Sequence, residues 1–208
     1  MLELARPAAP PLVTFDEERH LYFLDGKPVP GVSDVLRRAG LNRDQYGPEV
    51  EAARERGKRV HLDTARDDDG TLYEEAVFPE DRPYLEAWRA FRAETGFEPF
   101  SEWIERPAAS ATYRFAGTDD RVGLLHHDVT VIDIKTGGER PWWRWQTAAY
   151  QILYAETPGA PPPYCIKRAC VQLLPTGRYV IHPYNDRRDR DVFLAGVTCV
   201  HAAESAYA

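Results

Sequence analysis

Cysteines, methionines and long apolar runs are scarce in this chain of 208 residues, and each scarcity excludes a class of protein. The three cysteines, Cys165, Cys170 and Cys199, are too few for a four-thiolate iron–sulfur or zinc site, and we expect them to remain free thiols. The one methionine, Met1, excludes a methionine-rich binding surface. No apolar run approaches the roughly 20 residues that a membrane helix needs. Residues 1–7 lack the basic and apolar blocks of a secretory signal, so we expect a cytoplasmic protein without membrane contact.

An excess of positive charge is also missing. The net charge of −7 argues against a broad, nonspecific surface for nucleic acid. Local basic clusters remain at residues 54–59 and 187–190, and an acidic enzyme can still bind DNA through a basic groove and a metal. The length corresponds to one domain over residues 1–208, in which the first eleven residues, rich in proline and alanine, form an arm.

The apolar pattern and the turn signals predict a mixed α/β domain. We expect a β-hairpin over residues 14–24 that ends at Asp25-Gly26, and a short helix from Ser33, its N-cap, to Leu36. A helix over residues 48–65 is interrupted at Gly57 and followed by a solvated turn over residues 67–70. The remaining expected elements are helices at 80–95, 143–155 and 189–206, strands at 103–104, 113–116 and 129–134, and a hairpin of 166–174 with 179–182.

The residues that are candidates for catalysis or metal binding lie in the second half of the chain. Asp133 and Lys135 are two apart on an apolar strand, so their side chains leave the same face. Asp120 lies at the end of the preceding strand, and a hairpin through residues 125–128 returns Asp133 to its neighbourhood. Two carboxylates at close range repel each other, and a hard divalent cation relieves that repulsion. A lysine beside them is placed to orient or deprotonate a water.

In ordered combination, several motifs resemble those of the PD-(D/E)XK nuclease superfamily, in the branch of RecB-type nuclease domains and phage lambda-type exonucleases. The core of the resemblance is G-T-x-D-R at residues 117–121, V-x-D-x-K-T-G at 131–137 and Q-x-x-x-Y at 146–150. Residues 30–36 resemble the P-S-V-T-x-I-L segment of that branch, and 56–61 resemble its R-G-x-x-x-H helix. Each motif is weak alone, but the order of the set is specific.

The resemblance implies a role for each matching residue. His61, Asp120 and Asp133 are implied to bind Mg²⁺ or Mn²⁺, with the backbone carbonyl of Ile134 as a fourth contact. Lys135 is implied to position the attacking water and to offset charge on the phosphate. The remaining implied site residues are Gln146 and Tyr150, which support Lys135 and contact phosphate, and Glu105, which holds a water of the metal and competes for that role with Glu102.

Other residues have simpler interpretations. Asp119 occupies a position that is usually apolar in the G-T-x-D-R motif, and the spacing from Gly117 favours Asp120 as the inward acid. We expect His126 and His127 to be exposed in a hairpin turn, and residues 187–190 to be a solvated start of a helix. For Trp142, Trp143 and Trp145 two interpretations stay open, namely one tryptophan that stacks on a base, or a core role for Trp143 with the others beside a helix start.

The resemblance implies a restriction-endonuclease-like α/β fold with a mixed central sheet flanked by helices. It implies a metal-dependent deoxyribonuclease, an exonuclease that processes linear single- or double-stranded DNA in recombination, repair or phage DNA processing. No iron–sulfur cluster is expected, and a homo-oligomer or a recombination partner protein remains open. The alternatives are an endonuclease, a DNA-binding or assembly subunit with the same fold, and a different metal-dependent hydrolase. The complete set of Asp120, Asp133, Lys135 and Gln146 argues against a pure scaffold, which has no need to bury those polar groups.

Overall fold

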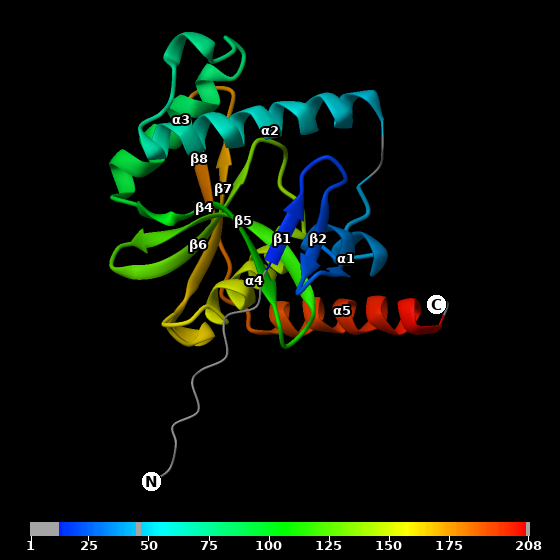
Figure 1. The fold of residues 1–208 in the computed structure, drawn as a ribbon. Coiled ribbons are helices and arrows are strands. Elements are labelled where there is room, and N and C mark those ends of the chain that lie inside the picture. The colour runs from blue at the N-terminus through cyan, green and yellow to red at the C-terminus, as the bar shows by residue number, and fades with distance from the viewer. Residues whose placement is uncertain (1–12, 45–46, 207–208) are drawn as a thin grey trace.

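The computed structural model describes residues 13–44 and 47–206, with the side chains of residues 48 and 49 left out, so the expected N-terminal arm lies outside the described residues. Two sheets are present in this part of the chain (Figure 1). A small antiparallel sheet contains β1 (Val13–Asp16), β2 (Leu21–Leu24) and β3 (Lys27–Val29). The central sheet has five strands in the order β4-β5-β6-β7-β8.

The central sheet is mixed, as the sequence predicts. β4 (Glu98–Ser110), β5 (Phe115–Leu125) and β6 (Asp128–Lys135) are antiparallel neighbours, β7 (Lys167–Leu173) is parallel to β6, and β8 (Tyr179–Pro183) is antiparallel to β7. The parallel step from β6 to β7 requires a crossover, which helix α4 (Trp143–Ala155) provides. The structure confirms the restriction-endonuclease-like architecture.

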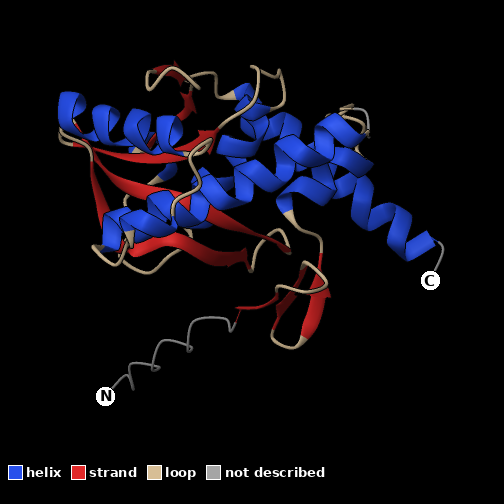
Figure 2. Cartoon of the chain, turned by 90° about the horizontal axis from the view of Figure 1, so that it is seen from above, coloured by secondary structure: helices blue, strands red, loops and turns tan. Residues whose placement is uncertain are grey.

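Helices cover both faces of this sheet (Figure 2). α2 (Pro48–Asp69) and α3 (Arg82–Thr95) pack on one face, where Trp88 and Phe91 meet Ile132 and Val171. α4 packs on the other face together with α1 (Val32–Arg38) and α5 (Arg188–Ala206). Two short 3₁₀ turns, Glu74–Ala76 and Pro163–Cys165, complete the described elements. Among the described residues, no helix has the length and apolar character needed to span a bilayer.

The small sheet rests on the N-terminal half of β5. The ring of Tyr22 packs with Leu24, Val29 and Ala116, and its hydroxyl lies 3.0 Å from the hydroxyl of Thr118. The predicted hairpin is confirmed as β1 and β2. Asp25-Gly26, both with positive φ, joins β2 to β3 in the two-residue turn that such dipeptides favour.

Three local predictions are wrong for identifiable reasons. α1 begins at Val32 after an extended Gly31, and Ser33 is not its N-cap. α2 is continuous through Gly57, since one glycine costs a helix only about 1 kcal/mol and α2 extends well beyond it on both sides. The expected turn at 67–70 is instead the last turn of α2 with a glycine C-cap, since buried partners hold Asp68 within the helix.

β5 also differs from the prediction. The strand expected at residues 113–116 begins at Phe115 and continues to Leu125, so Asp120 lies in the middle of β5 and not at its end. The paired register between β5 and β6 stops at Arg121 and Ile132. Asp120 and Asp133 follow directly beyond this last pair, at the point where the two strands separate.

Candidate active site

The separation of β5 from β6 leaves backbone groups for side chains to bind. The N–H of Ile134 donates to Asp120 Oδ2 at 2.6 Å, in place of a strand partner. The carbonyl oxygen of Ile134 lies 3.1 Å from Nε2 of His61, which α2 brings across this gap. The break in the ladder therefore explains why functional side chains gather at this point of the sheet.

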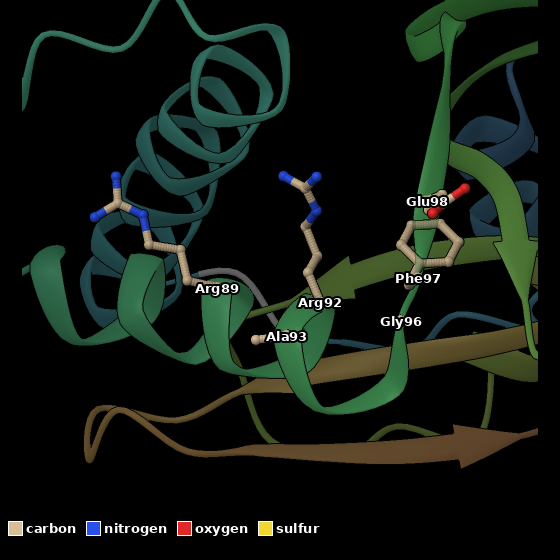
Figure 3. Close-up of a pocket in the computed structure, with 6 residues that line it drawn as sticks. All are labelled: Arg89, Arg92, Ala93, Gly96, Phe97 and Glu98. Carbon is tan, nitrogen blue, oxygen red and sulfur yellow. The ribbon is translucent and has the colours of Figure 1, made fainter.

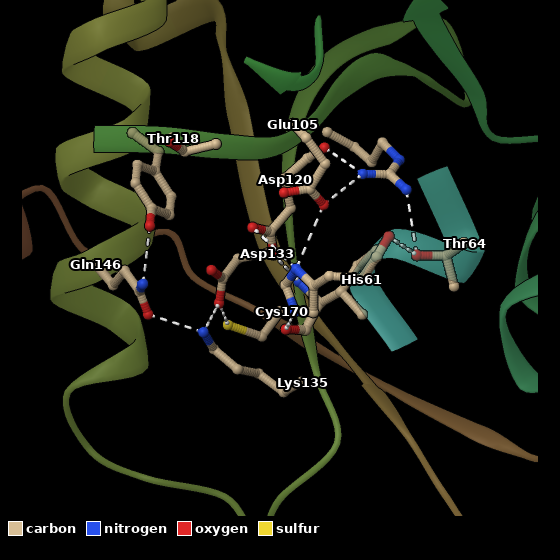
Figure 4. Close-up of polar contacts among 12 residues, drawn as sticks. His61, Thr64, Glu105, Thr118, Asp120, Asp133, Lys135, Gln146 and Cys170 are labelled. Carbon is tan, nitrogen blue, oxygen red and sulfur yellow. Dashed lines mark hydrogen bonds and ion pairs between the residues drawn. The ribbon is translucent and has the colours of Figure 1, made fainter. Parts of the chain in front are cut away.

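A histidine and two carboxylates form the closest cluster of candidate ligands (Figure 4). His61 Nδ1 lies 3.3 Å from Glu105 Oε1 and 3.5 Å from Asp120 Oδ1. One ligand atom from each of the three residues lies within 4.8 Å of the others. The side chain of Asp120 is nearly buried, whereas those of His61 and Glu105 retain a quarter and a third of their exposure. The cluster is thus accessible from one side.

The electrostatics of the cluster follow from this geometry. Burial by itself lowers the pKa of His61, but the carboxylates of Asp120 and Glu105 outweigh it and raise that pKa well above its usual value. Burial conversely opposes ionisation of Asp120, yet His61, Lys135 and the Ile134 N–H together lower the pKa of its carboxyl. The metal-free arrangement is therefore an imidazolium ion held between two carboxylates. A cation of higher charge fits the same position.

Asp133 and Lys135 lie together at the end of β6. Lys135 Nζ is 2.7 Å from Asp133 Oδ2, which also accepts a hydrogen bond from the Cys170 thiol at 3.2 Å. Among the described residues, Asp133 Oδ1 is buried without a hydrogen-bond partner. Burial, reinforced by the nearby Asp120, raises the pKa of Asp133 to about 6 despite the lysine. One carboxylate oxygen thus stays available for a cation, as the implied ligand role requires.

A hydrogen-bond chain from α4 supports the lysine. Lys135 Nζ donates to Gln146 Oε1 at 2.9 Å, and Gln146 Nε2 donates to the Tyr150 hydroxyl at 2.9 Å. The four-residue spacing puts Gln146 and Tyr150 on one face of the helix. The structure therefore brings Gln146 to Lys135 directly and connects Tyr150 to it through Gln146.

The positions of Glu105 and Glu102 show which of the two belongs to the cluster. Glu102 is exposed and accepts a bond from Ser101, its chain neighbour, whereas Glu105 lies in the His61 cluster. Glu105 also accepts a hydrogen bond from Arg121 Nη1 at 2.9 Å and has a positive φ of 46°, just beyond a register shift between β4 and β5. Such a strained backbone is typical of functional sites.

Arg121 is a component that the sequence interpretation missed. Its side chain is fully buried, and its Nε donates to Asp68 Oδ2 at 2.6 Å while Nη2 donates to the Thr64 hydroxyl. The guanidinium group also lies 5.5 Å from the ring centre of Trp88. Arg121 was visible in the G-T-x-D-R motif, but no local pattern identifies Asp68 as its partner, because 53 residues separate them.

These donors fit a hard divalent cation. The cluster itself offers one imidazole and two carboxylates, from His61, Glu105 and Asp120, and the carbonyl of Ile134 lies next to His61. The structure does not include Asp133 in this cluster, although Asp133 is close enough for Asp120 to raise its pKa. Oxygen-rich sets with a histidine suit Mg²⁺ or Mn²⁺ better than soft ions. The orphaned Oδ1 of Asp133 supports the fit independently of the cluster, since a buried carboxylate oxygen is costly to leave without a partner.

Asp119 is buried next to Asp120, and among the described residues its carboxylate has no hydrogen bond to the other site residues. Neither of its carboxylate oxygens has a hydrogen-bond partner among the described residues. Burial, with Asp120, Asp133 and Glu105 nearby, raises the pKa of Asp119 well above its usual value. Both adjacent acids are thus buried, and Asp120 is the one that reaches His61, in agreement with the expected orientation.

Asp119→Leu should therefore stabilise the metal-free protein by about 1–3 kcal/mol near pH 7, since it removes an unpaired buried polar group and keeps its shape. The raised pKa means that the penalty is absent below pH 3.8 and grows as pH rises, so the gain should shrink toward pH 4. Urea unfolding in EDTA at both pH values measures this. A Leu variant less stable than the parent at pH 7 would show that Asp119 has a hidden stabilising partner.

The other expected residues lie as follows. His126 and His127 are exposed in the β5–β6 turn, which confirms the prediction for them. Trp143 is buried against His182, as its core interpretation requires. The prediction that residues 187–190 form a solvated start of a helix is wrong for Asp189, because this residue is buried and bonded to Arg168 and Arg144.

Two pockets in the described part of the chain can be compared with this site. A shallow pocket of about 350 Å³ at the end of α3 is lined by Arg89, Arg92, Ala93, Gly96, Phe97 and Glu98 (Figure 3). Its two guanidinium groups are already paired with Asp67, Glu74 and Asp68. A second pocket of about 40 Å³ lies between Tyr22 and Tyr150, with room for a few water molecules. The residues that line these two pockets do not include His61, Glu105 or Asp120.

Comparison with known proteins agrees with this geometry. A family model described as the PD-(D/E)XK nuclease superfamily matches residues 35–190. The matched span contains every residue of the candidate site, whereas β1, β2 and β3 precede it. A search of curated proteins found no match.

Proposed function

The chain belongs to the PD-(D/E)XK nuclease superfamily, and from that premise we propose that it is a metal-dependent deoxyribonuclease that hydrolyses phosphodiester bonds at DNA ends. The observation that carries this proposal is the meeting of the His61, Glu105 and Asp120 cluster with the Asp133–Lys135 pair where β5 and β6 separate. Helix α2 and the three strands β4, β5 and β6 contribute these groups, so chance proximity is a poor explanation.

We assign the ion to His61, Asp120, Asp133 and the Ile134 carbonyl, with Glu105 holding a water beside it. The chemistry that a bound Mg²⁺ or Mn²⁺ supplies there is positive charge next to the phosphate and easier deprotonation of the attacking water. To receive it, His61 gives up its proton and turns from a cation into a neutral ligand. Asp120 is already ionised in this environment, which favours binding.

Lys135 has a separate role at the phosphate. Its ammonium group remains charged, because the attraction of Asp133 outweighs burial and raises its pKa. Gln146 fixes the direction of that group from α4, and Tyr150 in turn fixes the amide of Gln146. A cation held in this way before the reaction stabilises the charge that develops on the phosphoryl oxygens and orients the attacking water.

The preference for DNA ends is proposed from the family resemblance and not from the geometry of the site. The motif order resembles the RecB-type and phage lambda-type branch, and residues 1–208 are proposed as one nuclease domain. Processing of linear DNA in recombination, repair or phage DNA processing follows from that resemblance by analogy. An oligomer or a recombination partner protein remains compatible with it.

A nuclease assay on three substrates tests the proposal. End-labelled linear duplex, linear single strand and closed circular DNA are incubated with Mg²⁺, Mn²⁺ or EDTA. We expect metal-dependent loss of the linear substrates alone. Cutting of the circle would replace the exonuclease by an endonuclease, and binding without hydrolysis of any substrate would favour a DNA-binding or assembly subunit. Asp133→Ala should be inactive on every substrate that the parent protein cuts.

A further inference from the structure

Trp142 lies over the amino group of Lys135. The ammonium nitrogen is 5.3 Å from the centre of the indole ring, a distance at which a cation and an aromatic face attract each other. Of the two other tryptophans nearby, Trp143 is buried in the core and Trp145 packs against the core cluster. Trp142 itself is partly exposed. It is therefore the tryptophan whose position relates directly to the site.

A contact unrelated to catalysis holds the indole in place. Trp142 Nε1 donates to Asp44 Oδ2 at 3.1 Å, and Arg140 Nε lies 3.3 Å from Asp44 Oδ1. Asp44 follows α1 in the chain, so these two contacts connect the segment between β6 and α4 to a separate part of the fold. The ring is thus fixed before substrate arrives, which lowers the entropy that a stacking contact costs.

The placement has a consequence for the substrate. A phosphate bound at Lys135 carries its sugar and base within one nucleotide of the indole. Aromatic rings bind bases of any sequence by stacking, but a base inside a duplex already stacks on its neighbours and pairs with its complement. Only an unpaired nucleotide can use such a ring without disrupting a helix.

We propose that Trp142 stacks on the base beside the scissile phosphate and that the site consequently takes single-stranded DNA or a frayed duplex end. This inference rests on the proposed function and specifies its substrate class. Trp142 contacts substrate directly, in addition to the shield that its ring gives to Lys135.

Abasic nucleotides test the stacking contact. Binding is measured for single-stranded oligonucleotides that are intact, or that lack the base at the terminal or at the penultimate position, with Asp120→Asn present to prevent cleavage. Loss of the stacked base, or Trp142→Ala, should each weaken binding about 5- to 100-fold. The two losses should not add, because they remove the same contact, and Trp142→Phe should retain most of the affinity.

Tyr164→Ala is the matched control, since Tyr164 is a highly exposed aromatic residue outside the site, and it should leave binding unchanged. Additive losses, or equal binding of intact and abasic strands by the Asp120→Asn protein, would overturn the proposal. The abasic comparison needs no Trp142 variant, so a misfolded Trp142→Ala protein does not decide it. Absence of hydrolysis by the parent protein would count against the proposed function alone, because an abasic effect on binding would remain.

Discussion

Lys135→Ala should lower kcat for DNA hydrolysis by about 100- to 1,000-fold, with a smaller change in KM. That range is typical when a single preorganised group that stabilises transition-state charge is removed. The side chain is 15% exposed and bonded to both Asp133 and Gln146, so its charge is held in one position before substrate binds. Its loss also leaves the buried Asp133 without its ion pair, so the rates must be compared at saturating Mg²⁺.

Lys167→Ala provides the charge-matched control. Lys167 is exposed at the first residue of β7, the opposite end of the sheet from the site, because Lys135 pairs with Gln172 near the last residue of that strand. This variant should keep parental kcat while carrying the same change in net charge. A Lys135→Ala protein that cuts DNA at more than a tenth of the parental rate would remove the lysine from the proposed chemistry.

Asp68→Ala should destabilise the protein by about 3–5 kcal/mol, the loss expected when one partner of a buried ion pair is removed. Asp68 and Arg121 are both fully buried, and Asp68 Oδ1 also accepts a hydrogen bond from the indole of Trp88 at 2.9 Å. The truncation would leave the buried guanidinium group of Arg121 with Glu105 as its remaining ion-pair partner among the described residues. Because Arg121 also donates to Glu105, the divalent cation should bind more weakly as well.

Urea unfolding in EDTA measures the stability effect, and Asp34→Ala is its control. Asp34 pairs with Arg37 and Arg38 near the surface, where ion pairs contribute about 0–1 kcal/mol. A loss below 1 kcal/mol for Asp68→Ala would show that solvent or another acid compensates Arg121. That result would remove the support assigned to Glu105.

The parts of the site that the sequence predicts are those with short-range patterns. Asp133 and Lys135 share a strand face because of the two-residue period, and Gln146 and Tyr150 share a helix face because of the four-residue spacing. The turn at His126 and His127 returns β6 along β5, as expected. Such regularities require no knowledge of tertiary contacts.

The missed parts depend on packing between distant segments. The acidic run before Gly70 has the composition of a solvated turn, but Arg121 makes Asp68 a buried residue. Gly57 has a low intrinsic helix propensity, but packing of the helix against the sheet, for example through Val60, outweighs that cost of about 1 kcal/mol. Glu105 is distinguished from Glu102 by its contact with His61 and by its left-handed backbone, and no local sequence pattern indicates either feature.

Binding of Mn²⁺ by the free protein, followed by its electron paramagnetic resonance, tests the central claim most directly because it needs no substrate. We expect the parent protein to bind Mn²⁺, Asp120→Asn to lose binding, and Asp34→Asn to keep it. Affinity should rise between pH 5.5 and 7.5, since binding displaces protons from Asp133, whose pKa burial raises to about 6, and from His61. No binding at millimolar Mn²⁺, or binding that Asp120→Asn leaves intact, would contradict a metal centre at the separation of β5 and β6.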